Sequence, residues 1–274
     1  MLQLEKIISK KVLEDLYVNQ KLSDFEIGSV YGVSYGRIHR LRNRYGIKAI
    51  EYYQRHSKQE LDMQEKEFLI GVMLGDGHIR WRNKESTKTY PQLMLEQTTK
   101  HYEYVLWLKE RIQGWIYDVN KPLRKAKKII NNKEHTSYPI STINHPVFIE
   151  FYKAFYNKDK KIIDIEFIKK YFSTLSLAVW IMDDGTNSND RNLIICSHSF
   201  TQEENNILSK FLYEKYGLTS SIINSGKYYY LSFTKESSIK IKNIVKEYIV
   251  PSMMYKLVSS ETTNGARIIT NNNT

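Results

Sequence analysis

The spacing of hydrophobic residues divides the chain into an N-terminal helical part and a longer part of mixed structure. Up to Leu16, hydrophobic residues recur at the three- and four-residue spacing of amphipathic helices. Residues 51–61 are polar and have no clear period, which is typical of a linker. Beyond them, helical patterns alternate with strand-like runs. We therefore expect a small all-α domain at 1–50, a linker at 51–64 and a larger domain after it.

Residues 21–47 have the pattern of a helix-turn-helix. Ser23, with Glu26 three positions later, forms the capping box of a first helix. Residues 31–33 follow as the turn. We expect the first helix to direct three hydrophobic residues inward: Phe25, Ile27 and Val30.

The second helix of this pair carries an excess of basic residues. Ser34 caps it, Ile38 and Leu41 face the core, and Gly46 ends it. From Ser34 to Lys48 there are five Lys or Arg residues and no acid. A solvated helix normally mixes charges, so this one resembles a recognition helix that enters the major groove of DNA; a purely structural hairpin is the alternative. The residues expected to contact DNA are Arg37, Arg40, Arg42 and Arg44.

Two similar segments, Phe68–Gly77 and Leu177–Gly185, lie 108 positions apart. Each is followed by the same order of patterns, namely a basic or polar stretch, a strand-like run, a helix, a second pair of strand-like runs and another helix. The corresponding runs in the two copies are 91–98 and 192–197, 102–112 and 201–216, and 138–143 and 228–233. This order predicts two αββαββα repeats, at 65–157 and 158–274, and a fold of the α+β class.

The first of these segments has the composition of a tightly packed helix. Asp62 and Glu65 form its capping box. Gly71 and Gly75 leave one stripe of the helix without side chains, which permits the close approach of another helix. Gly77 suits the left-handed conformation that often ends a helix.

Both segments end in an Asp-Gly pair, at Asp76 and at Asp184. A carboxylate in the last turn lies at the negative end of the helix dipole, at a cost of about 0.3–1 kcal/mol. If the two helices pack side by side, two acids meet in a basic protein, and a cation would stabilise them. Hard oxygen ligands that face phosphates select Mg²⁺. The alternative is that each pair is an ordinary turn, which the duplication makes a weaker explanation.

Composition narrows the class of partner and the location. The 274 residues include 41 Lys and Arg against 30 Asp and Glu, and the net charge of +11 favours nucleic acid, with a basic enzyme as the alternative. No apolar run approaches the roughly 20 residues of a membrane span, and the N-terminus does not resemble a signal peptide. A single cysteine, Cys196, excludes a disulfide framework and a cysteine-based zinc site. We expect no membrane partner and a location in the cytoplasm, associated with the nucleoid, or in an organellar matrix.

The paired segments resemble the LAGLIDADG motif of homing endonucleases and related intron maturases. In register, the motifs are Leu69–Gly77 and Leu177–Gly185, and the tail Pro251–Leu257 resembles the end of two-motif members. The resemblance spans about 65–258. It implies a monomer with pseudo-two-fold symmetry, in which the motif helices pack at the centre and two four-stranded antiparallel sheets form a saddle over double-stranded DNA.

The resemblance also implies an active site. Asp76 and Asp184 would bind Mg²⁺ across the minor groove, and cleavage of both strands would leave short 3′ overhangs. Gly75 and Asp183, which precede these acids, are the adjoining candidates at the metal. The position of Gly185 favours Asp184 over Asp183 as the ligand.

Other candidate residues follow from the same resemblance. Gln97 matches a polar residue that orders water in this family, and His198 lies at the same offset in the second copy, where a groove contact or a surface group is the alternative. Lys235 is the candidate for a basic residue on a later strand. Residues 121–133 are strongly basic, and a nuclear localisation signal is the alternative to phosphate binding there. The expected DNA contacts are Arg80, Arg82, Arg124, Lys125, Lys127 and Lys128.

The function expected from these patterns is that of a site-specific homing endonuclease. Such an enzyme makes metal-dependent double-strand breaks in a long asymmetric DNA target and so promotes the mobility of its host intron or intein. The alternative is a non-cleaving binder of the same fold, either a maturase that binds its own intron RNA or a DNA-binding regulator that acts through residues 1–50.

Overall fold

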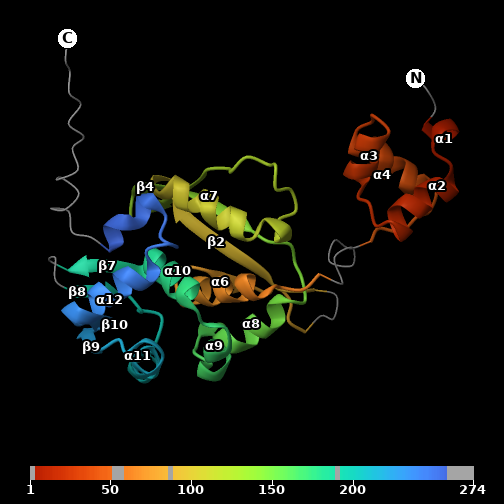
Figure 1. The fold of residues 1–274 in the computed structure, drawn as a ribbon. Coiled ribbons are helices and arrows are strands. Elements are labelled where there is room, and N and C mark those ends of the chain that lie inside the picture. Colours follow the sequence, from red (N-terminus) through yellow and green to blue (C-terminus); the bar gives the residue numbers. More distant parts are fainter. Residues whose placement is uncertain (1–3, 51–58, 86–88, 189–191, 258–274) are drawn as a thin grey trace, which may run out of the picture. The chain divides into compact units, whose positions relative to one another are not determined.

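The chain forms two compact units, residues 1–59 and 60–274, which are described separately (Figure 1). A computed structural model describes residues 4–50, 59–85, 89–188 and 192–257. The helices of the first unit are α1 (Leu4–Ile7), α2 (Lys10–Glu14), a π-helical turn (Asp15–Asn19), α3 (Asp24–Val30) and α4 (Tyr35–Arg44). Residues 51–58, which we expected to form part of a linker, lie outside the described residues.

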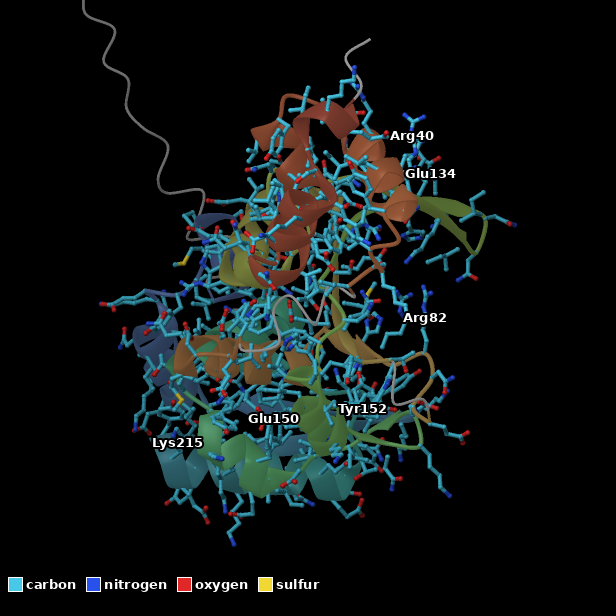
Figure 2. All side chains as sticks on the ribbon, turned by 90° about the vertical axis from the view of Figure 1, so that its right-hand side faces the viewer. Arg40, Arg82, Glu134, Glu150, Tyr152 and Lys215 are labelled. Atoms are coloured by element: carbon cyan, nitrogen blue, oxygen red, sulfur yellow. The ribbon has the colours of Figure 1, made fainter. Side chains whose placement is uncertain are left out.

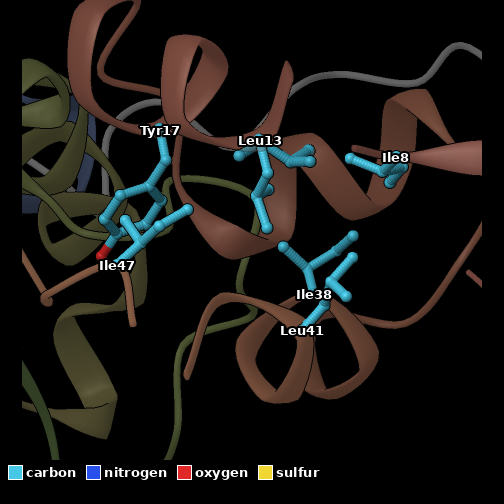
Figure 3. Close-up of a cluster of buried hydrophobic side chains, with 7 residues drawn as sticks. Ile8, Leu13, Tyr17, Ile38, Leu41 and Ile47 are labelled. Carbon is cyan, nitrogen blue, oxygen red and sulfur yellow. The ribbon is translucent and has the colours of Figure 1, made fainter. Parts of the chain in front are cut away.

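The first unit has a hydrophobic core of its own. Leu13 faces Ile38 and Leu41 of α4, and the ring of Tyr17 lies beside Ile47, as Figure 3 shows. The predicted capping box at the start of α3 is present, and the inward positions of Ile27, Ile38 and Leu41 are confirmed. These contacts give the first unit the helix-turn-helix order that its sequence predicts.

The prediction that Phe25 and Val30 face inward is wrong. Both side chains are about two-thirds exposed, at 67% and 68%. Ile27 and Gly28 form the buried face of α3, and the helical period turns Phe25 and Val30 away from that face. Gly28 packs so closely that a Cβ atom there would lie 2.6 Å from the carbonyl oxygen of Val33.

The second unit contains the same order of elements twice, which confirms the predicted α+β fold. The first copy consists of α6 (Met63–Leu74), β1 (His78–Arg80), β2 (Gln92–Thr98), α7 (Tyr102–Arg111), β3 (Ala126–Ile130), β4 (Lys133–Ser141) and α8 (Phe148–Phe155). The second copy consists of α10 (Thr174–Asp184), β7 (Gly185–Ser188), β8 (Asn192–Ile195), α11 (Gln202–Tyr216), β9 (Ser220–Ser225), β10 (Tyr228–Phe233) and α12 (Lys235–Val245).

The copies are joined by a short hairpin and one helix. The elements of this connection are β5 (Tyr156–Asn157), β6 (Lys160–Lys161) and α9 (Ile165–Tyr171). After α12, a 3₁₀ helix, Pro251–Lys256, ends the described chain. No helix in the described ranges is long and apolar enough to cross a membrane.

Each copy contributes one antiparallel sheet with the same strand order. The orders are β1-β2-β4-β3 and β7-β8-β10-β9. Along β2, Leu93, Leu95 and Gln97 are buried, whereas the alternating Met94 and Glu96 are more exposed. This period of two gives each sheet one face against the helices and one open face.

Helices α6 and α10 pack side by side in the second unit (Figure 1). A Cβ atom on Gly71 would lie 2.5 Å from the carbonyl oxygen of Ser176, and one on Gly75 would lie 2.5 Å from Oδ2 of Asp183. The hydroxyl of Ser176 also donates a hydrogen bond across the pair to the carbonyl oxygen of Glu67, at 2.6 Å. The close approach predicted from the two glycines is therefore confirmed.

The end of α6 differs in one respect from the prediction. The capping box of Asp62 and Glu65 is present at its start. Gly77, however, does not adopt a positive φ angle, so its predicted left-handed conformation is wrong. Glycine is required at this position for a steric reason, because a Cβ atom there would lie 2.1 Å from Cγ1 of Val72.

Candidate active site

Helices α6 and α10, which carry the two motifs, end beside one another. Each is associated with one aspartate at its end. Asp76 follows the last residue of α6 by two positions and is exposed. Asp184 is the last residue of α10 and is partly buried. Each acid precedes a glycine that leads into the first strand of its copy. The pairing of α6 with α10 thus brings together the two acids that the sequence places 108 positions apart.

A hydrogen-bond network surrounds Asp76. The amide nitrogen of Gln97 donates to Oδ2 of Asp76 at 2.8 Å and to Oδ1 of Asp183 at 3.1 Å. The backbone N–H of Asp76 donates to Oδ2 of Asp183 at 3.1 Å. The hydroxyl of Tyr104 donates to Oδ1 of Asp183 at 2.8 Å. Asp183 therefore accepts hydrogen bonds from three groups of the first copy, although it belongs to the second.

The carboxylates repel one another. Burial and the nearby Asp76 raise the pKa of Asp184 to about 7, while Lys161 and Lys256 act in the opposite direction. Burial, with Asp76 and Asp184, also raises the pKa of Asp183 well above its usual value. Burial and the neighbouring Asp183 raise the pKa of Tyr104 as well, which keeps its hydroxyl protonated as a donor.

Lys161 and Lys256 donate hydrogen bonds to backbone carbonyl groups at equivalent positions of the two copies. Nζ of Lys161 donates to the carbonyl oxygens of Gly75, at 2.8 Å, and of Gly77, at 3.1 Å. Nζ of Lys256 donates to the carbonyl oxygen of Asp183 at 3.1 Å. Gly75 and Asp183 each precede the motif acid of their copy, so the two lysines are counterparts. Burial lowers the pKa of Lys161, and the three aspartates act against that shift.

Neither lysine is among the site residues predicted from the sequence. Lys161 lies on β6, after the last helix of the first copy, and Lys256 lies in the 3₁₀ helix after the last helix of the second. The sequence feature that could have indicated them is a lysine after the last helix of each repeat. It is weak, because the region around Lys161 contains several lysines and local pattern does not distinguish them.

The donor groups at the helix ends fit a hard divalent cation. Within the described ranges, no three His, Cys, Asp or Glu side chains form a group that could hold a metal ion. Asp183 is directed to Tyr104 and Gln97, and the carbonyl oxygen of Gly75 accepts a hydrogen bond from Lys161. The carboxylates of Asp76 and Asp184 are therefore the candidate protein ligands. Mg²⁺ is usually bound by only one or two carboxylates, and water and phosphate oxygens complete its coordination.

The expected position of Lys235 is wrong. It does not lie on a strand, because β10 ends at Phe233 and Thr234 caps α12. Lys235 is the first residue of that helix and is exposed. The side chain of Thr234 accepts the hydrogen bond of Ser237 N–H, which fixes the start of α12 at this point.

The expected equivalence of His198 and Gln97 is also wrong. Gln97 lies four residues before His101, the N-cap of α7, and Ser197 lies four residues before Thr201, the N-cap of α11. Ser197 is thus the counterpart of Gln97, and its buried hydroxyl bonds to Asn205. The ring of His198 instead packs on that of Tyr228, with a centroid distance of 5.1 Å.

The basic residues of α4 divide into two groups. Arg42 is buried, with 3% of its surface exposed, so its expected role as a DNA contact is wrong. Its guanidinium pairs with Asp24 at 3.1 Å, lies over the ring of Tyr17 and donates to the carbonyl oxygen of Ile47. Arg42 therefore holds α4 to the rest of the first unit. Arg37 is partly buried, Arg40 and Arg44 are exposed, and Arg44 forms an ion pair with Glu5.

The basic residues of the first sheet are exposed. Arg82 extends away from the body of the second unit (Figure 2). Arg80 donates to Oε1 of Gln92 on the neighbouring strand at 2.8 Å. Arg124 and Lys125 precede β3, and Lys127 and Lys128 lie on it.

Two of these lysines have acidic partners on the sheet. Lys127 pairs with Glu134 at 3.1 Å, and Lys128 pairs with Glu96 at 2.7 Å. The basic run that contains no acid in sequence is therefore partly neutralised by neighbouring strands. Such exposed pairs are weak and are screened by salt, so a phosphate can compete for the lysines.

Comparison with known proteins identifies relatives of two kinds. Residues 66–241 match the LAGLIDADG DNA endonuclease family. The chain is 32% identical over 201 residues to the cytochrome b mRNA maturase bI2 of Debaryomyces hansenii, over 72% of this chain and 74% of that protein. It is 30% identical over 219 residues to the probable intron-encoded endonuclease 1 of Wickerhamomyces canadensis, over 77% of this chain and 90% of that protein.

Solved structures with a similar fold include one of a protein bound to DNA. It is that of the homing endonuclease I-WcaI bound to its DNA recognition sequence. The TM-score is 0.66 at 25% sequence identity, and the similarity covers 73% of this chain and 88% of that chain.

Proposed function

Because the chain belongs to the LAGLIDADG DNA endonuclease family, we propose that it is a site-specific, Mg²⁺-dependent DNA endonuclease that cuts both strands of a long asymmetric target. The observation that carries this proposal is the juxtaposition of Asp76 and Asp184 at the ends of the paired helices. The influence of Asp76 on the pKa of Asp184 supports a site at which the two acids act together. Since one chain supplies both acids, we propose that the active form is a monomer.

The protein groups have separate tasks in hydrolysis of the phosphodiester. Asp76 and Asp184 would hold Mg²⁺, which supplies an activated water and neutralises charge on the phosphate when bound. Gln97 orients the carboxylate of Asp76 through its amide. Lys161 and Lys256 place positive charge near the helix ends, where it favours the ionised form of Asp184 and opposes the negative charge that develops in the transition state.

We propose that the exposed basic residues bind the DNA backbone. Those of the open sheet face and its loops would position the duplex, and alternating strand residues would read base edges. Arg40 and Arg44 of α4 would extend the contact to a second segment of DNA. Cleavage of an uninterrupted allele would promote the mobility of the host intron or intein.

Plasmid cleavage tests this proposal. A plasmid that carries the uninterrupted host locus is incubated with the protein in Mg²⁺ or in EDTA. We expect linearisation with Mg²⁺ only, and loss of double-strand cleavage in Asp76→Asn and Asp184→Asn while DNA binding persists. Cleavage that survives in both variants would contradict the assignment of these acids.

A maturase function is the second candidate, because the relative at 32% identity bears that name. The same protein preparation can be tested for retention of the intron RNA on a filter. Tight, specific RNA binding with no cleavage of the plasmid would favour the maturase over the endonuclease.

A further inference from the structure

The network around Asp76 crosses from one repeat to the other. Asp183 is the penultimate residue of α10 in the second copy, yet Tyr104, Gln97 and the backbone of Asp76, all in the first copy, donate to its carboxylate. Both oxygens of Asp183 are therefore occupied by donors from the first copy. The packing of α6 against α10 permits this because Gly75, opposite Asp183, has no side chain.

The second copy has different residues at the corresponding positions. The counterpart of Asp183 is Gly75, and the counterpart of Gln97 is Ser197, whose hydroxyl bonds to Asn205. Tyr104 is the third residue of α7, and the third residue of α11 is Glu204.

Glu204 takes part in the capping box of its own helix. One oxygen of its carboxylate accepts from the backbone N–H of Thr201 and the other from that of Ile163. In the described part of the chain, the network around Asp76 therefore has no equivalent around Asp184.

We propose that Tyr104 and Asp183 are positioning residues for Asp76 alone, so that the two DNA strands are cut by unequal centres. The inference rests on the proposed endonuclease function and deepens it. Asp183 fixes the backbone of Asp76 through Oδ2, and it shares the amide of Gln97 with the Asp76 carboxylate through Oδ1. Tyr104 holds Asp183 in the orientation that serves both contacts.

Removal of the Tyr104 hydroxyl isolates this role. Tyr104→Phe keeps the ring, which is buried and stacks on Trp107 with a centroid distance of 5.9 Å. It deletes the donor to Asp183 and leaves Gln97 as the donor to Oδ1. Asp183 then gains rotational freedom, and both the backbone and the carboxylate of Asp76 are held less firmly.

Strand-resolved kinetics test the inference. A duplex that contains the cleavage site is labelled differently on each strand, and the nicking rate constants are measured in a single turnover with excess enzyme. We expect Tyr104→Phe to slow one strand by about tenfold to a hundredfold, because loss of positioning acts on the chemical step. The other strand should change by less than about twofold. The matched control is Tyr171→Phe, which removes the hydroxyl of another buried tyrosine, in α9.

Two further variants make the result specific. Asp183→Asn can keep the bonds from Tyr104 and Gln97 but then presents an amide N–H to the N–H of Asp76, so we expect it to slow the same strand. Gln97→Leu, which loses the direct contact with Asp76, should also slow that strand. Equal effects on both strands, or effects of the three variants on different strands, would overturn the inference.

A second readout does not depend on cleavage. Mn²⁺ binding to the complex with a cleavage-resistant phosphorothioate duplex is measured by electron paramagnetic resonance. We expect weaker Mn²⁺ binding in Tyr104→Phe, at unchanged DNA affinity in EDTA. Unchanged Mn²⁺ binding would overturn the positioning role, whereas a wild-type protein that cuts neither strand would overturn the endonuclease proposal itself.

Discussion

At the end of α10, the surroundings of Asp184 make its charged form less favourable than it is in water. Burial and the nearby Asp76 raise the pKa of Asp184, and Lys161 and Lys256 act against this shift. Because the pKa of Asp184 is raised to about 7, the folded protein binds its proton more tightly than the unfolded chain does. The stabilisation from this group is therefore present at acidic pH and decreases as the pH rises from about 4 to 7.

The raised pKa of Asp184 gives a prediction for the stability of the metal-free protein. In EDTA, the free energy of unfolding of the wild type should fall between about pH 4 and pH 7 relative to that of Asp184→Asn. At pH 8 the variant should be the more stable by about 1–3 kcal/mol, because it lacks a buried charge beside Asp76. Urea unfolding across this pH range checks the difference. Parallel curves for the two proteins would contradict it.

The lysines at the motif backbones give a second prediction at this scale. Lys161→Met should slow cleavage by about 10²–10³-fold, since it removes a buried positive charge behind the acids, while DNA affinity stays near the wild-type value. Lys160→Met is the matched control, because Lys160 is the exposed neighbour on β6. The cleavage rate and the DNA affinity on filters are measured for the wild type, Lys161→Met and Lys160→Met. An equal loss in the two variants would indicate a general charge effect.

At the scale of elements, α4 combines a structural face and an exposed basic face. Arg42 forms the buried contacts with Asp24, Tyr17 and Ile47, whereas Arg40 is exposed and bonds only to its own helix backbone at Gly36 in the described residues. A purely basic run in sequence thus contains residues with opposite tasks. The difference follows from the helical period, which turns Arg42 toward the core beside Leu41 and Ile38.

Substitution of each arginine separates the two tasks. Arg42→Ala should destabilise the first unit by about 3–5 kcal/mol, because Asp24 would lose its arginine partner at a partly buried site. Arg40→Ala should leave the unit folded but weaken DNA binding, with the slope of log K against log salt smaller by about 0.9. Thermal unfolding and a salt titration measure these effects. Loss of folding in Arg40→Ala would contradict this division.

At the scale of the whole molecule, the chain consists of two units with separate cores. The core of the first unit is formed within residues 8–47, and the motif helices lie entirely in the second. Cleavage and the additional DNA contact are therefore expected to be separable. The two units together would recognise a longer DNA segment than the second unit alone.

Deletion of residues 1–50 tests this separation. The shortened protein should still cut its target at saturating concentration, because Asp76, Asp184 and both lysines remain. Its affinity for a long duplex should fall, and the salt dependence of binding should become less steep as phosphate contacts are lost. The comparison uses full-length and shortened protein on the same DNA. Unchanged affinity would show that the first unit is not a DNA-binding module in this complex.

The sequence by itself determined the order of elements and the motif acids. Helical and strand periods, the Ser23 and Asp62 capping boxes, and the 108-residue repeat are local or simply repeated signals, so they predict the αββαββα order and the positions of Asp76 and Asp184. The glycines of α6 indicated close packing for the same reason, since the absence of a side chain is visible without knowledge of the partner.

Only the tertiary structure decided which side chains meet at these positions. Arg42 became a core residue, Lys161 and Lys256 reached the two motifs, and Asp183 turned to Tyr104, at sequence separations from 18 to 107 residues. A local pattern specifies the face of a helix or strand but not the element that covers it. Burial, ion pairing and the shifted pKa values depend on that covering element, and for this reason they followed from the fold.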